Sequence, residues 1–79
     1  MTTTKRRKEW IECRVSRGMF SDERTVELGG RLFFVDEKSI RNETEDASAE
    51  VEVVVLEKPS GERWAVMPTN SRETVLLGS

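Results

Sequence analysis

The fold of this chain is decided by residues 50–67, which read EVEVVVLEKPSGERWAVM. The first part, residues 51–57, is rich in valine, which is stiff at χ1 and packs well on a pleated surface. Residues 58–61, Lys-Pro-Ser-Gly, are turn formers, and residues 63–67 then resume the apolar pattern. Two such runs across a short Pro/Gly turn predict a β-hairpin at the centre of the domain.

Shorter segments with strand-like alternation flank this hairpin on both sides. Residues 9–17 and 24–28 alternate apolar and polar side chains, and Gly29-Gly30 is typical of a two-residue hairpin loop. Residues 31–36 return with apolar side chains on both faces, and residues 74–77 form a last short strand. The side chains expected to face the core from these outer strands are Ile11, Cys13, Val15, Val26, Leu28, Val75 and Leu77.

Three connections between the strands have sequence patterns that predict their local structure. Asp36 is placed as the N-cap of one helical turn that tucks Ile40 inward. Asn70 and Glu73 have the spacing of a capping box, which predicts a second single helical or 3₁₀ turn. The apolar pair Met19-Phe20 is expected to plug one end of a small barrel.

These elements predict an all-β fold, a small antiparallel barrel of five to six strands in a single domain at residues 9–77. Residues 1–8 are expected to be a disordered basic tail. The last part, a long hairpin, one helical turn and a short strand, resembles in topology the closing half of SH3-like barrels. The resemblance does not extend to the aromatic signature of peptide-binding SH3 domains, because the chain has no Tyr. An OB-like barrel and a fold completed by dimerisation are the alternatives.

The composition argues against catalysis. The chain has no His, and its single Cys13 alternates with apolar neighbours, so we expect a buried thiol with no base to activate it. Five carboxylates gather in residues 43–52, without the Gly and ligand spacing of a calcium loop, which indicates a solvated acidic loop. We therefore expect no enzymatic activity, no cofactor and no metal ion.

Charge and hydropathy limit the kinds of partner that this chain is expected to have. No secretory signal and no membrane-spanning run is present, so an intracellular, cytoplasmic protein without a membrane partner is expected. Four basic residues occupy positions 5–8, whereas residues from Glu9 onward hold nine basic and fifteen acidic side chains, a net charge of −6. An acidic body argues against a duplex-DNA binder that depends on a basic face.

Two binding hypotheses remain. The first is an interaction module that binds a protein partner through an exposed aromatic patch or a sheet edge, with a homodimer also possible. Its candidate contact residues are Trp10, Arg14, Phe33 and Arg63. The second is an adaptor for single-stranded RNA or DNA that uses the basic N-terminal arm, Lys5, Arg6, Arg7 and Lys8.

Overall fold

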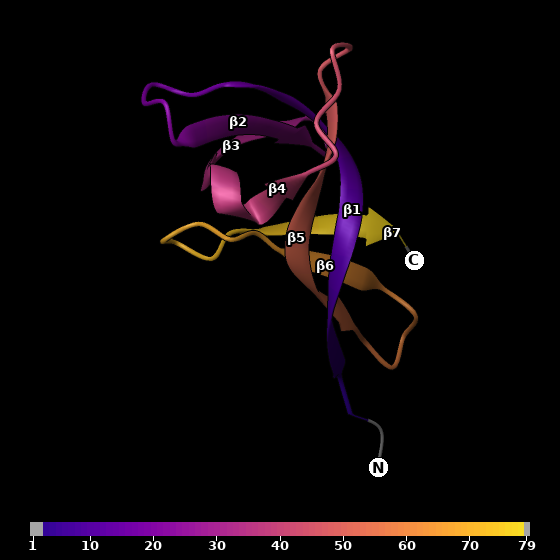
Figure 1. Ribbon diagram of the computed structural model, residues 1–79. Coiled ribbons are helices and arrows are strands. Elements are labelled where there is room, and N and C mark those ends of the chain that lie inside the picture. Colours follow the sequence, from indigo (N-terminus) through magenta and orange to yellow (C-terminus); the bar gives the residue numbers. More distant parts are fainter. Residues whose placement is uncertain (1–2, 79) are drawn as a thin grey trace.

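The computed structural model describes residues 3–78, which contain seven antiparallel strands and one 3₁₀ turn joined by loops (Figure 1). The elements in chain order are β1 (Lys5–Arg17), β2 (Glu23–Leu28), β3 (Arg31–Asp36), η1 (Glu37–Ser39), β4 (Ile40–Arg41), β5 (Ser48–Glu57), β6 (Arg63–Val66) and β7 (Thr74–Gly78). The predicted all-β class is confirmed.

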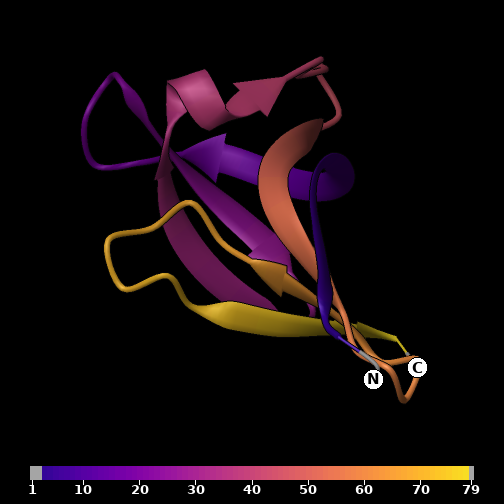
Figure 2. The ribbon, with the colours of Figure 1, turned by 90° about the horizontal axis from the view of Figure 1, so that it is seen from below.

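One curled sheet contains all of these strands in the order β3-β2-β1-β5-β6-β7, and β4 pairs with β5 beside this path. The sheet bends around a single interior and forms a half-barrel, so that β3 and β7 are its two edges (Figure 2). Every strand pair is antiparallel. The succession of long hairpin, turn and short last strand in β5, β6 and β7 is compatible with the SH3-like topology expected from the sequence.

The central hairpin forms as predicted. β5 and β6 pair with Val55 opposite Ala65 and Leu56 opposite Trp64. Because strand side chains alternate between faces, each pair shares one side of the sheet. Val55 and Ala65 are buried, whereas Leu56 and Trp64 are only half-buried on the outer face.

The core is the inner face of the curled sheet. Every strand longer than two residues contributes to it, and its ten buried members are Cys13, Val26, Phe33, Val35, Val51, Val53, Val55, Ala65, Met67 and Val75. The inward positions expected from alternation are confirmed, with Ile11, Leu28, Ile40 and Leu77 packed at the margin. Six of the ten buried residues are valines, so the core depends on β-branched side chains from neighbouring strands.

The N-terminal strand begins earlier than expected. Residues 5–8 belong to β1 and pair with residues 54–57 of β5, so the expectation of a disordered tail is wrong for these four residues; Met1 and Thr2 lie outside the described residues. The physical reason is the length of β5. Its second half would lack a partner on one side without them, and backbone pairing is open to charged residues.

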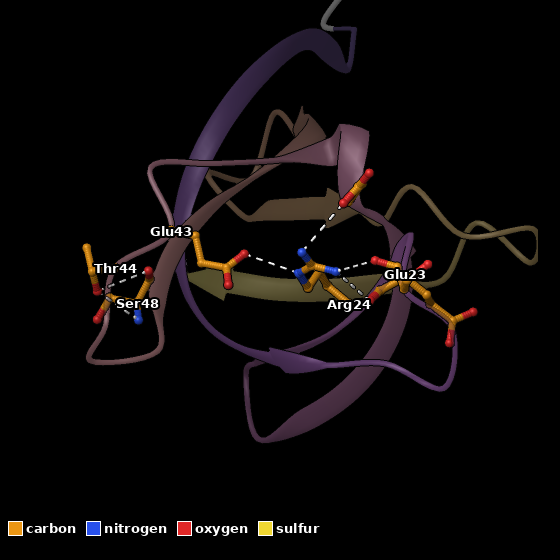
Figure 3. A network of polar contacts seen from close by, with 7 residues as sticks. Glu23, Arg24, Glu43, Thr44 and Ser48 are labelled. Atoms are coloured by element: carbon orange, nitrogen blue, oxygen red, sulfur yellow. Dashed lines mark hydrogen bonds and ion pairs between the residues drawn. The ribbon is translucent and has the colours of Figure 1, made fainter.

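The Met19-Phe20 pair does not plug the barrel. The two side chains are 83% and 63% exposed in the loop between β1 and β2. The inward-facing side chain nearest this loop is Arg24, whose register partner Val35 is buried. Its guanidinium donates hydrogen bonds to the carbonyl oxygens of Ser21 and Glu23, and it forms ion pairs with the carboxylates of Glu43 and Glu37 at 3.2 and 3.5 Å (Figure 3).

Two turn predictions need correction. Residues 37–39 form the expected 3₁₀ turn, but the Asp36 side chain makes no capping hydrogen bond. Residues 70–73 form no helical turn. Thr69 organises this turn instead, because its carbonyl accepts from the Arg72 amide and its hydroxyl accepts from the Glu73 amide. A threonine one residue earlier thus takes the place expected for Asn70.

Candidate functional site

The four candidate contact residues do not form one surface. Phe33 is 1% exposed and belongs to the core, so its assignment to an exposed aromatic patch is wrong. Arg63 lies on the inner side, where it forms an ion pair with Glu9 at 3.4 Å. Trp10 and Arg14 share the outer face of β1.

The Trp10 ring is covered on the outer face. The Arg41 guanidinium lies 4.3 Å from the ring centroid, a cation–π distance. Arg41 is held there by Glu50, which accepts a hydrogen bond from Arg41 at 2.9 Å and another from the Asn42 amide at 2.7 Å. These two donors hold the pKa of Glu50 below its ordinary value, so the arrangement stays charged at neutral pH. Trp10 is therefore a covered side chain and offers little free ring surface to a partner.

The four residues of the basic arm are divided between the two faces of β1. Lys5 and Arg7 point to the same side as Glu9, and Arg7 forms an ion pair with that carboxylate, which raises the pKa of Arg7. Arg6 and Lys8 point to the outer face, beside Leu56 and Val54 of β5. The arm is thus part of the sheet, and only two of its cations face the outer surface.

The exposed apolar surface missed by the sequence analysis is on β3. Leu32 and Phe34 are 64% and 61% exposed, on the outer face of a strand that forms one edge of the sheet. Their neighbours on β2 are Glu27 and Thr25. The signal was present in the sequence. A two-residue loop at Gly29-Gly30 pairs Phe33 with Val26, which already faced inward, and this leaves Leu32 and Phe34 outward.

The backbone of the same two residues faces the open side of the edge. Gly29 and Gly30 have φ values of 62° and 76°, as in a type I′ turn, so Leu28 and Arg31 exchange both ladder hydrogen bonds. Antiparallel pairs alternate between hydrogen-bonded and non-hydrogen-bonded positions. The N–H and C=O groups of Leu32 and Phe34 therefore point away from β2.

The edge is closed at one end only. The Arg31 guanidinium donates a hydrogen bond to the carbonyl of Thr74 at 2.8 Å and lies 3.3 Å from the Glu73 carboxylate. These contacts join the β2–β3 turn to the start of β7. Beyond them, within residues 3–78, no backbone hydrogen bond to the N–H or C=O groups of Leu32 or Phe34 is found on this open side. Backbone groups and apolar side chains are therefore presented together at this edge.

The Cys13 thiol is buried in the core beside β2 and β5. Burial raises its pKa to about 11, and the carboxylates of Glu12 and Glu50 add to the shift. A thiol with a raised pKa is a poor nucleophile, because the thiolate is the reactive form. Within the described residues, no group of three or more potential metal-ligating side chains is found, and no helix is long and apolar enough to cross a membrane.

The raised pKa of Cys13 predicts a loss of stability at alkaline pH. The folded state holds this proton more tightly than the unfolded chain, so its contribution is present below about pH 9 and is lost as pH rises towards about 11. Urea unfolding at pH 7 and pH 10 should show a lower midpoint at pH 10. The Cys13→Ala variant serves as the control and should show a smaller decline; an equal decline in both proteins would contradict the assignment.

The fold and this edge define a small antiparallel half-barrel with an open apolar strand. Comparison of the chain with protein-family models, with curated proteins and with solved structures finds no match.

Proposed function

We propose that this protein is a small β-barrel interaction module that binds a protein partner as an added strand along β3. The observation that carries the proposal is the open edge at Leu32 and Phe34, where two exposed apolar side chains accompany unpaired backbone groups. In strand addition, main-chain hydrogen bonds supply affinity and side chains on alternate positions supply specificity. β3 offers both at the same two residues.

The lack of protection at this edge supports the same reading. Sheet edges are commonly guarded by Lys, Pro, a bulge or a covering loop, because an unguarded apolar edge pairs with other chains. Between Arg31 and Asp36, β3 carries only Leu, Phe, Phe and Val. The outward members, Leu32 and Phe34, add apolar area that a partner would remove from water, at about 25 cal/mol per Å².

The single-stranded nucleic-acid alternative receives less support. Binding of this kind depends on open aromatic rings on which bases stack. The Trp10 ring is covered by Arg41, and the Lys58 ammonium lies 5.2 Å from the Trp64 ring centroid. Phe34 is exposed, but its neighbours on the outer face include the acidic Glu27. The two exposed Phe rings lie on β3 (Phe34) and in the loop after β1 (Phe20), whereas the cations of the arm lie at the start of β1.

Photo-crosslinking tests the proposal. A photoreactive amino acid replaces Phe34 in one protein and Lys38, an exposed residue of η1, in a control protein. We expect a defined protein adduct from position 34 in a lysate of the source cells, and none from position 38. The adduct should be lost when Leu32→Lys is added, since this change places a charge on the edge and leaves the core intact.

Amide hydrogen exchange provides the second readout. In the free protein the amides of Leu32 and Phe34 should exchange faster than those of Phe33 and Val35, and binding of the crosslinked partner should slow the first pair. An adduct between two copies of this chain would identify the partner as a second copy, so that the protein forms a homodimer. Identical adducts from positions 34 and 38, or unchanged exchange in the complex, would overturn the proposal.

A further inference from the structure

A second candidate surface lies on the outer face of β1, β5 and β6. It is an open groove of about 540 Å³, which we call the basic groove. Its floor consists of the half-buried side chains Val54, Leu56 and Val66. Its rim carries three exposed cations, Arg6, Lys8 and Arg72. Among the described residues, Glu52 is the one acidic side chain that lines it, so these side chains give the groove a net charge of +2.

The strand register explains how the groove is built. Lys8, Val54 and Val66 lie opposite one another on three adjacent strands, and Arg6 and Leu56 form the next row. Adjacent strands are about 4.8 Å apart, so the floor is roughly 10 Å wide. Arg6 and Lys8 form one wall, and the loop of residues 68–72 after β6 forms the other. Cations therefore stand on both sides of an apolar strip.

The rim cations differ from six of the ten other basic residues of this chain. In the part of the chain that the structure describes, six Arg and Lys side chains form ion pairs, namely Arg7, Arg24, Arg31, Arg41, Lys58 and Arg63. Within the described residues, none of the three rim cations forms one. Three positive charges against one carboxylate around one groove, in a protein with a net charge of −2, produce a local field that favours an anionic ligand.

The floor decides which anionic ligand fits. Its side chains are aliphatic. Trp64 lies opposite Leu56 on the neighbouring strand, but the Lys58 ammonium lies over its ring. Bases would find no open ring to stack on. The groove is open and its cations are spread over two walls, so one headgroup with an acyl chain would not reach them all. Several carboxylates spaced along a peptide would reach the cations on both walls.

We propose that the basic groove binds an acidic peptide segment of a protein partner, with aliphatic side chains on the floor and carboxylates on the rim cations. Arg6 and Lys8 lie in the first half of β1, whereas β2, the strand that pairs with β3, pairs with residues 14–17 at the other end of β1. The inference therefore goes beyond the proposed function and does not depend on it. It gives the protein two distinct contact surfaces.

A synthetic peptide tests the proposal directly. The probe is a fluorescent peptide of about eight residues, long enough to follow the groove at roughly 3.3 Å per residue, with two central leucines flanked by aspartates. Fluorescence anisotropy should show binding at low salt and weaker binding at about 0.3 M salt. The double variant Arg6→Glu/Lys8→Glu should bind about tenfold more weakly or worse.

Three controls separate the groove from general electrostatics. The variant Arg17→Glu/Lys38→Glu has the same change in net charge at exposed positions outside the groove, and it should bind within about twofold of the unmodified protein. A peptide with serines in place of the leucines should bind more weakly, as should the near-isosteric floor variant Val54→Thr with the original peptide. Circular dichroism confirms that each variant is folded.

Two outcomes would overturn this inference. Equal weakening by both charge-reversal variants would show that the peptide responds only to net charge. Binding of labelled oligouridylate that depends on Arg6 and Lys8, without binding of the peptide, would assign the groove to nucleic acid. Failure of the β3 crosslinking experiment would leave this result unaffected, because none of the groove residues lies on β3.

Discussion

The Phe33→Ala variant should lose about 3–5 kcal/mol of its free energy of unfolding, the range for removal of a buried aromatic ring. Phe33 is 1% exposed and is the largest of the fully buried side chains. Natural domains have roughly 0.05–0.15 kcal/mol of stability per residue, which corresponds to about 4–12 kcal/mol for this chain. The loss would therefore remove a large fraction of the total, and we expect a largely unfolded protein at 37 °C.

The adjacent ring provides a matched control. Phe34 is 61% exposed on the opposite face of the same strand, so Phe34→Ala should change stability by no more than about 0.5 kcal/mol. Urea unfolding followed by circular dichroism measures both variants. Similar losses from the two substitutions would show that β3 is not held in the register described above, and the proposed binding edge would fall with it.

The Gly29→Ala variant should be the second most damaging of the substitutions considered. Gly29 has a φ of 62°, and a Cβ built there would lie 2.6 Å from Cγ1 of the buried Val75. The left-handed backbone costs a non-glycine residue about 1–2 kcal/mol. The contact adds about 1–3 kcal/mol, the usual cost of overpacking. The total loss of stability in the Gly29→Ala variant therefore depends on how closely the β2–β3 turn approaches β7.

Gly30→Ala separates the two costs. Gly30 has a similar φ of 76°, but a Cβ there would meet no atom within 4 Å. The difference between the two variants therefore measures the contact with Val75 alone, and it should amount to about 1–3 kcal/mol. In a double-mutant cycle, Val75→Ala should reduce this difference. Equal effects at the two glycines would indicate that the turn does not contact β7.

Much of the strand content could be predicted from local pattern. Alternation in residues 9–17 and 24–28 and the valine run in residues 51–57 identified strands and their inward faces, because a half-buried strand imposes a period of two. The turn predictions were less successful. Asn70 and Glu73 have capping-box spacing, but a capping box needs a following helix. Residues 74–78 pair with β6 instead.

The two proposed surfaces were harder to predict, for different reasons. The choice between Phe33 and Phe34 could have been made, since the Gly29-Gly30 loop and the inward Val26 together determine the register. The basic groove could not, because its two walls come from residues 6–8 and 68–72, which are brought together by the pairing of β1, β5 and β6. No pattern local to either segment contains that pairing.

The sequence by itself determined most of the strand segments, the inward faces of β1, β2 and β5, and the position at which the central hairpin turns. These properties follow from local steric preference and from the burial of one face. The tertiary structure alone decided the order of the strands, the ordering of Lys5–Lys8 by β5, the inward turn of Arg24 in place of Met19-Phe20 and the two candidate surfaces. Each of these depends on contacts between residues far apart in the chain, whose energies appear only when the sheet has curled.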